Sequence, residues 1–436
     1  MTVILLAVIV ILTLKVCFEF FLERLNADYV ARNRHHLPSV FKGVFDRETF
    51  DKSNDYTLAK SRLGRKEIFF DGIVLALVLL LGVLPFLYDL LSGWLGFGLW
   101  GQALVFVTLL FVLSLPGLPF DWYSQFRLEE SFGFNKTTLK LWWSDKAKGL
   151  LLTYAIGVPL AALILWIPTR FSEFWWLIGF AVVFGVQLLM LVLYPILIVP
   201  LFNKLQPLDE GELNDRLMAL ADRTGFKAKT IQVIDGSKRS SHSNAYFTGF
   251  GRFRRIVLFD TLIEQLNPEE IEAVLAHEIG HYRKGHIPRM IAVSAVSLAL
   301  GFWILQWLSG QDWFIGGFGF DLSPALYGEM ARYVPAFLLF VILGGLVTFW
   351  ISPLFNWLSR RHEYEADRFA RDAMGSPKPL ISALRAMYKK NLGNLIPHPS
   401  YSRFHYSHPT LREREKSLKA LADSPKTPEE ESAQLA

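Results

Sequence analysis

Two histidines and a glutamate near the middle of the chain have the types and spacing of a metal site. His277 and His281 are four residues apart and Glu278 follows the first of them, which gives the pattern HExxH. On a helix the two imidazoles share one face, so they can bind one zinc ion while the glutamate acts as a general base. Chance would give this pattern roughly 0.01 times in a chain of this composition. The spacing therefore predicts zinc-assisted hydrolysis rather than a solvated polar helix.

The residues before the motif predict the helix that the chemistry needs. Asn267 is suited to cap a helix, Pro268 to its first turn, and Glu269 and Glu270 to its positive end. We therefore expect the motif helix to begin at this point.

A hydrolytic zinc site needs a third protein ligand and an open position for water. His286 follows His281 by five residues and would lie on another face of a continued helix. The longer pattern HExxHxxGxxH would need a histidine where Ile287 stands. A ligand from elsewhere in the chain is therefore expected.

Residues 359–367, SRRHEYEAD, supply two acidic candidates one helical turn apart. Glu363 and Asp367 share a helix face, so one can bind the metal while the other orients a ligand histidine. His362 and Glu365 are expected to point elsewhere. The alternative is a solvated charged helix.

The composition places this chemistry in a membrane protein. Hydrophobic residues make up 52% of the 436 residues and charged residues 19%, and the single cysteine excludes an intrachain disulfide. A helix needs about 20 apolar residues to cross a bilayer. Seven segments qualify: near Thr2–Phe21, Ile68–Leu91, Trp100–Leu118, Gly149–Ile167, Phe174–Val199, Pro288–Leu308 and Tyr333–Phe355.

The loops between these segments predict their orientation. Alternate loops are rich and poor in Lys and Arg, and the first loop alone carries ten: Arg24, Arg32, Arg34, Lys42, Arg47, Lys52, Lys60, Arg62, Arg65 and Lys66. The positive-inside rule then puts the N-terminus outside and the C-terminus in the cytoplasm. The formal net charge of +5 fits such loops better than nucleic-acid binding, so no nucleic-acid partner is expected.

This topology divides the chain into five predicted regions. They are membrane segments one to five in 1–199, a cytoplasmic region with HExxH in 200–287, segments six and seven in 288–357, a cytoplasmic region with the third ligand in 358–422, and a disordered tail in 423–436. Within the second region we expect a helix over Asp209–Thr224 and strands over Thr230–Ile234, Ala245–Phe250 and Arg255–Phe259.

Taken together, these motifs resemble the integral-membrane zinc metalloproteases of the type 1 CAAX prenyl protease family. HEIGH and SRRHEYEAD carry the resemblance, with supporting stretches from about Tyr56 to Arg414: EESFGFNKTT, PLFNKLQPL, GSKRSSHSNAYFTGFG and HYSHPTLRER. The resemblance implies a fold of seven transmembrane helices around an intramembrane chamber, with a small cytoplasmic α+β region that carries HExxH. It implies one zinc ion per chain, and a peptide or protein substrate that may carry a lipid.

The resemblance also assigns individual roles. His277, His281 and Glu363 match the zinc ligands, Glu278 the catalytic base and Asp367 the acid behind the ligands. The substrate-binding strand matches at Asn244 and Ala245, and the late basic pair that faces the reacting carbonyl matches at His408 and Arg414.

Other classes of protein remain as alternatives. A transporter would usually place ionisable residues inside its spans, and segments four to seven have almost none in their centres. A structural zinc in an inactive scaffold would usually have a fourth ligand, and a protease with HExxH inside a span would immerse the charged flanks of the motif in lipid. Heat-shock membrane metalloproteases share HExxH but lack the FGFNKTT and HYSHP stretches. The substrate stays open between CAAX-type processing and quality control of membrane proteins. A bacterial inner membrane is favoured over the endoplasmic reticulum, and membrane lipids are expected neighbours.

Overall fold

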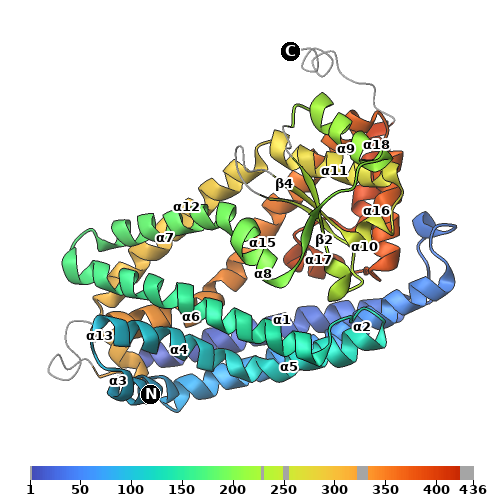
Figure 1. Cartoon of the computed structure of the whole chain (residues 1–436). Coiled ribbons are helices and arrows are strands. Elements are labelled where there is room, and N and C mark those ends of the chain that lie inside the picture. The colour runs from blue at the N-terminus through green and yellow to red at the C-terminus, as the bar shows by residue number, and fades with distance from the viewer. Residues whose placement is uncertain (1, 227–229, 249–254, 322–331, 423–436) are drawn as a thin grey trace. The chain divides into compact units, whose positions relative to one another are not determined.

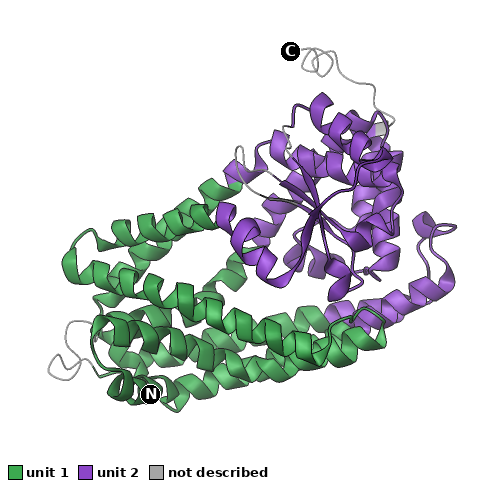
Figure 2. Ribbon diagram, in the orientation of Figure 1, with its two compact units in different colours: residues 1–24, 60–190, 290–352 green, residues 25–59, 191–289, 353–436 purple. Residues whose placement is uncertain are grey.

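The computed structural model describes residues 2–226, 230–248, 255–321 and 332–422. The described chain forms two compact units, which are coloured separately in Figure 2. Unit 1 holds 1–24, 60–190 and 290–352, and unit 2 holds 25–59, 191–289 and 353–436. The expected fold class is confirmed, because the chain is mostly helical and carries one small sheet. The expected tail, 423–436, lies outside the described residues.

Long apolar helices make up unit 1, and several continue into unit 2 (Figure 1). The helices with residues in unit 1 are α1 (Val3–Asn33), α2 (Arg47–Leu80), α3 (Val83–Leu95), α4 (Leu99–Ser114), α5 (Leu118–Tyr123), α6 (Leu139–Arg170), α7 (Trp175–Leu193), α12 (His286–Ser309), α13 (Asp312–Ile315) and α15 (Tyr333–Met374). Helices α4 and α6 pack against each other along their length.

Six helices of the described chain are long and apolar enough to cross a membrane, and a bent pair raises the number to seven. The pair is α2 and α3, which meet at an angle of 66°. Gly82 between them has φ +65°, a left-handed conformation that glycine adopts without strain. The second predicted segment, Ile68–Leu91, corresponds to this bent pair, and the other six predicted segments each have a matching membrane-capable helix.

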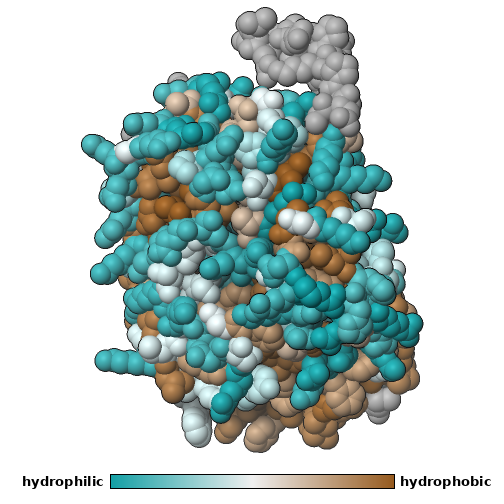
Figure 3. Space-filling view, turned by 90° about the vertical axis from the view of Figure 1, so that its right-hand side faces the viewer, coloured by the Kyte–Doolittle hydropathy of each residue, from teal (hydrophilic) through white to brown (hydrophobic). Residues whose placement is uncertain are grey.

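The surface of these helices suits contact with lipid. Large apolar side chains are exposed on several of them, including Trp94, Leu151 and Val296, each at 70% or more. Figure 3 shows one face of the molecule on which hydrophobic residues reach the surface among hydrophilic ones. Apolar groups exposed in such number are unfavourable in water but favourable in a bilayer.

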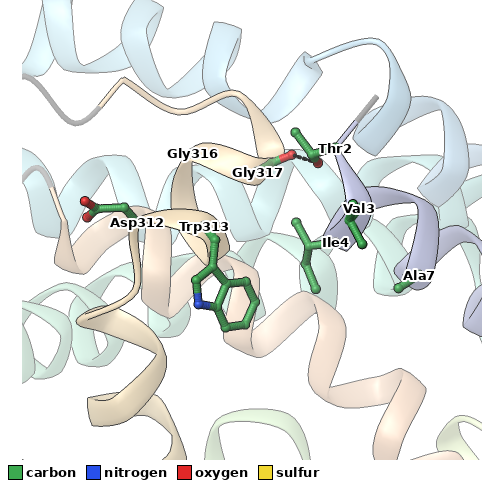
Figure 4. A pocket seen from close by; sticks show the side chains of 8 residues that line it. All are labelled: Thr2, Val3, Ile4, Ala7, Asp312, Trp313, Gly316 and Gly317. Carbon is green, nitrogen blue, oxygen red and sulfur yellow. Dashed lines mark hydrogen bonds between the residues drawn. The ribbon is translucent and has the colours of Figure 1, made fainter.

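A pocket of about 650 Å³ lies in unit 1 between the start of α1 and the region of α13 (Figure 4). Thr2 Oγ1 donates a hydrogen bond of 2.6 Å to the Gly317 carbonyl at its edge, and Asp312 is the one ionisable side chain in its lining. With one carboxylate and no histidine or cysteine among these eight residues, the lining offers no set of metal ligands. The pocket is therefore not the hydrolytic site.

Unit 2 contains a four-stranded sheet in the order β1-β2-β4-β3. The strands are β1 (Leu205–Pro207), β2 (Ile231–Ile234), β3 (Ala245–Thr248) and β4 (Arg255–Phe259). Strands β2 and β4 are parallel, whereas β1–β2 and β3–β4 are antiparallel. The strand expected over Ala245–Phe250 is present as β3, and residues 249 and 250 lie outside the described chain. Strand β1 was not expected.

Helices pack around this sheet to form the core of unit 2. They are α8 (Val199–Phe202), α9 (Glu212–Arg223), α10 (Asp260–Ile263), α11 (Pro268–Arg283), α16 (Lys378–Lys390), α17 (Pro399–His405) and α18 (Leu411–Ala422). The helix expected over Asp209–Thr224 is α9, and Gly225 follows it with φ +64°. Leu217, Leu220 and Leu275 are buried where α9 and α11 meet. This core fixes α11, the helix that carries HExxH.

Candidate active site

The motif helix α11 begins where the sequence predicts. The Asn267 side chain accepts a hydrogen bond of 2.9 Å from the Glu270 amide, and the Glu270 carboxylate accepts one of 3.0 Å from the Asn267 amide. This reciprocal capping box satisfies two amide groups that would otherwise lack partners. It sets the helical phase in which His277 and His281 share a face.

Glycine in HEIGH lets a second helix approach α11. A Cβ atom at Gly280 would lie 3.0 Å from Ala366 Cα and 3.1 Å from the Ala366 carbonyl oxygen on α15. Contacts that short to backbone atoms cannot be relieved by a side-chain rotation. Close packing at Gly280 thus places the part of α15 that carries Glu363 and Asp367 beside the motif.

Among the described residues, His277, His281 and Glu363 form the group that can hold a metal ion. His277 Nε2 and His281 Nε2 are 3.2 Å apart, and the Glu363 carboxylate oxygens lie 3.5 and 3.3 Å from them. Ligand atoms about 2.1 Å from a tetrahedral zinc ion lie about 3.4 Å from one another. The three donors therefore fit zinc.

Two further observations fit a hydrolytic metal site. Glu363 Oε2 is buried and its nearest nitrogens, on His277 and Arg414, lie 3.5 Å away, so a bound cation would give it a closer partner. Three protein ligands leave one position open, as in catalytic rather than structural zinc sites. Glu278 is half-buried beside His277, and its carboxylate has no hydrogen bond or ion pair within the described chain.

Asp367 and Arg414 lie behind His277. Asp367 Oδ1 is 3.0 Å from His277 Nδ1, and the Arg414 guanidinium binds both oxygens of the same carboxylate, with Nε at 2.9 Å from Oδ2. Burial and the Arg414 charge lower the pKa of His277, but its hydrogen bonds to Asp367 and Glu363 outweigh them and raise that pKa to about 9. These charges hold the ring with Nε2 toward the metal position.

A second histidine lies behind His281, which the sequence did not predict. His286 Nδ1 is 3.0 Å from His281 Nδ1, on the ring edge opposite the metal position. His286 is therefore not a fourth ligand, as the sequence predicts, but the reason is different. Helix α11 ends at Arg283 and α12 starts at His286, so the assumed continuous helix does not exist. Gly285, with φ +68°, was the signal for this break.

The late basic residues take two different positions. His408 Nε2 lies 3.4 Å from Glu363 Oε1, and its side chain is 64% exposed, so it borders the open side of the metal group. Arg414 is buried, with Nη1 3.5 Å from Glu363 Oε2 and its other nitrogens on Asp367. The two residues lie near one carboxylate but do not offer equivalent donors.

Strand β3 follows Asn244 at one edge of the sheet and packs against α11. The Asn244 carbonyl accepts a hydrogen bond of 3.1 Å from Phe259 N on β4. Backbone groups alternate in direction along a strand, so those of Ala245 point toward the free edge. The Ala245 N–H donates to Asn244 Oδ1 at 2.9 Å instead of to a carbonyl of β4.

Asn391 holds the backbone just before this strand, and no sequence signal identified it. Its Oδ1 accepts from Ser243 N at 3.2 Å, and its Nδ2 donates to the Ser243 carbonyl at 3.3 Å. Two bonds from one amide fix both the position and the direction of Ser243. Asn391 therefore sets where the edge strand begins.

The fold and the metal group define a class, a membrane-embedded zinc metalloprotease. Its sequence matches two family models, the N-terminal part of CAAX prenyl proteases, described as five membrane helices, over 26–204 and peptidase family M48 over 207–422. The chain belongs to the M48 family, in its CAAX prenyl protease 1 branch.

Several relatives match over nearly the whole chain. CAAX prenyl protease 1 of Saccharomyces cerevisiae is 40% identical over 419 residues, which cover 89% of this chain and 90% of the relative. The human CAAX prenyl protease 1 homolog is 34% identical over 431 residues, which cover 88% and 89%. The crystal structure of S. mikatae Ste24p aligns with a TM-score of 0.89 at 36% identity and covers 95% of this chain and 98% of that chain.

These findings confirm the predicted enzyme class, zinc cofactor and membrane character. The transporter and scaffold alternatives are not favoured. Helix α11 is not among the membrane-capable helices of the described residues, which argues against a motif inside a span. A protease of this class acts on a peptide or protein substrate.

Proposed function

We propose that the chain hydrolyses a peptide bond at a zinc site formed by His277, His281 and Glu363, with Glu278 as the general base. The observation that carries this proposal is the three-donor group of the described residues, with distances of 3.2 to 3.5 Å. Zinc bound there supplies an acidified water and a Lewis acid for the scissile carbonyl.

The chain's own residues then manage the protons. Glu278 has no competing partner within the described chain, so its carboxylate can take a proton from the attacking water and return it to the leaving amine. His408, exposed beside Glu363, donates an N–H toward the oxygen on which negative charge develops. Arg414 is engaged with Asp367, so its proposed role is to hold that acid rather than to contact the carbonyl.

Asn244 and Ala245 are proposed to bind the substrate backbone. The free edge of β3 presents main-chain groups, and a peptide added as a further strand would bond to them without demanding one side-chain sequence. The Asn244 side chain accepts a hydrogen bond from the Ala245 amide, and a bound substrate would replace it as the acceptor.

The proposed substrate is the C-terminus of a protein that carries a CAAX sequence and a prenyl group. Its support is the 40% identity with CAAX prenyl protease 1 over 89% of the chain. The test uses detergent-purified full-length protein, one CAAX peptide with and without a farnesyl group, and the Glu278→Gln variant as the inactive control.

Cleavage of the farnesylated peptide alone by the wild type supports CAAX processing. Equal cleavage of both peptides contradicts the requirement for a lipid and favours quality control of unmodified membrane proteins. Full zinc with no cleavage of either peptide contradicts the protease assignment, because the same preparation binds metal but does no chemistry.

We also propose that the N-terminus lies outside and unit 2 lies in the cytoplasm, which can be tested with the chain expressed in a bacterial inner membrane. The loop charges support the orientation. Since Cys17 is the single cysteine, a Cys17→Ala background permits labelling with a thiol reagent that does not cross membranes. Lys390→Cys should be protected in intact cells and Gly310→Cys labelled, and the reverse pattern would invert the topology.

A further inference from the structure

His286 makes contacts that neither the ligand set nor the base explains. It is the first residue of α12 and is 3% exposed, although two residues separate it from the end of α11. Gly285, with φ +68°, turns the chain so that the His286 ring returns beside His281. The ring also stacks on His362, with centroids 4.1 Å apart and planes 11° apart.

A chain of three polar contacts leads outward from the metal group through this ring. His281 presents Nε2 to His277 and Glu363, and its Nδ1 lies 3.0 Å from His286 Nδ1. His286 Nε2 then lies 3.0 Å from Glu365 Oε2. Arg289 Nη1 approaches the same carboxylate oxygen at 3.4 Å.

The chemistry of imidazole allows one assignment of protons along this chain. A histidine that binds metal through Nε2 keeps its proton on Nδ1, so His281 donates to His286. His286 must then be neutral and accept at Nδ1, which leaves its proton on Nε2 for donation to Glu365. A doubly protonated His286 would set one N–H against another.

We propose that His286 is a positioning residue that keeps His281 in the tautomer and ring orientation required for zinc, and that Glu365 orients His286 in turn. The inference rests on the proposed ligand set. His281 needs such a partner because its side chain is 23% exposed, against 9% for His277. Partners of this kind contribute about 10- to 100-fold to metal affinity or activity.

Two substitutions of similar polarity separate hydrogen bonding from packing. His286→Asn can place an amide oxygen near the position of Nδ1 and keep the acceptor for His281. His286→Gln places its amide near the position of Nε2 and loses that acceptor. The matched control is His362→Phe. This variant keeps an aromatic ring stacked on His286 and removes two ring nitrogens that are not part of the three polar contacts from His281 to Arg289.

The measurement is zinc affinity of the detergent-purified full chain by competition with a chromophoric chelator, together with the visible absorption of the cobalt-substituted protein. We expect His286→Gln to bind zinc about 10- to 100-fold more weakly and to shift the cobalt bands. We expect His286→Asn to lose clearly less, and His362→Phe to match the wild type.

Wild-type affinity and spectrum in His286→Gln would overturn the proposal. Equal losses in His286→Asn and His286→Gln would also overturn it, because the ring and not its acceptor would then be required. If the wild type itself bound no zinc, the proposed ligand set would fail instead, so the two failures are distinguishable.

Discussion

The two histidines of α11 are held from behind by opposite kinds of partner. Behind His277 lies a buried ionic pair, in which Asp367 has an exposed side-chain fraction of 0% and Arg414 of 9%. Behind His281 lies a neutral ring, His286, whose own partner Glu365 is 39% exposed. His277 is therefore held by charges in a low-dielectric environment, whereas His281 is held by hydrogen bonds between neutral rings near solvent.

This difference indicates a division of tasks between the two sides. A charge pair deep in unit 2 ties the metal group to the packing of α15 and α18, so its loss should affect folding as well as zinc. The contacts of His286 beside His281 contribute little to the free energy of folding, because their outer residues, Glu365 and Arg289, are exposed. Their loss should affect the metal alone.

The largest expected effect comes from a residue that belongs to neither side. Glu278→Gln should lower cleavage by about 10²- to 10⁴-fold, because the amide cannot accept the proton of the attacking water. Zinc content should stay at the wild-type level, since both supporting sides are intact. Metal analysis and peptide cleavage on the same preparation test this. Loss of zinc in the variant would make Glu278 a ligand instead.

Arg414→Leu should disrupt the buried ion pair behind His277. It removes one partner of a buried ion pair, which costs about 3–5 kcal/mol of folding free energy. The matched control is Arg289→Leu on the other side, where the guanidinium is 56% exposed and the expected cost is at most about 1 kcal/mol. Denaturant unfolding of both variants in one detergent measures the difference, and equal losses would remove the distinction between the two sides.

The two sides should also respond differently to pH. Without metal, the pKa of His277 is raised to about 9 despite burial and the Arg414 charge, by its bonds to Asp367 and Glu363. Below that pH zinc must displace a proton, so its affinity should fall as the pH falls from 9 toward 7. At pH 8 the wild type should release about one proton more on binding than Asp367→Asn.

Calorimetry in two buffers of different ionisation enthalpy gives the number of protons released. His286→Asn serves as the comparison and should release as many protons as the wild type, since it leaves Asp367 in place. Equal release by Asp367→Asn and the wild type would show that Asp367 does not set the pKa of His277.

The sequence predicted the acidic residues beside His277 better than the histidine beside His281, for physical reasons. Glu363 and Asp367 share a helix face at a spacing of four, and HExxH together with the Asn267 cap fixes the facing helix. The contact of His286 depends on a helix break, which appears in the sequence only as Gly285. A one-residue change in where α11 ends would move that ring to another face.

The same limit applies to the fold. Apolar length predicted the six membrane-capable helices and the apolar stretch of the bent pair, but the bend at Gly82 depends on a single backbone conformation. Strand β1 has three residues, too few for an alternating pattern. Asn391 contacts Ser243 across 148 residues of sequence, and asparagine is common in loops, so no local pattern could identify it.

The smallest expected effect is at Asn391, which supports neither of the two histidines. Asn391→Ala removes both hydrogen bonds to the Ser243 backbone, each of which contributes about 0.5–1.5 kcal/mol, and longer contacts with the Ser243 hydroxyl and the His242 ring. Because these bonds position the substrate-binding edge and not the metal, KM should rise several-fold while kcat and zinc content stay unchanged. Asn214→Ala is the matched control, since its amide donates to Leu208 next to β1, at the opposite edge of the sheet. A fall in kcat without a change in KM would mean that the strand aligns the reacting bond instead of binding the substrate.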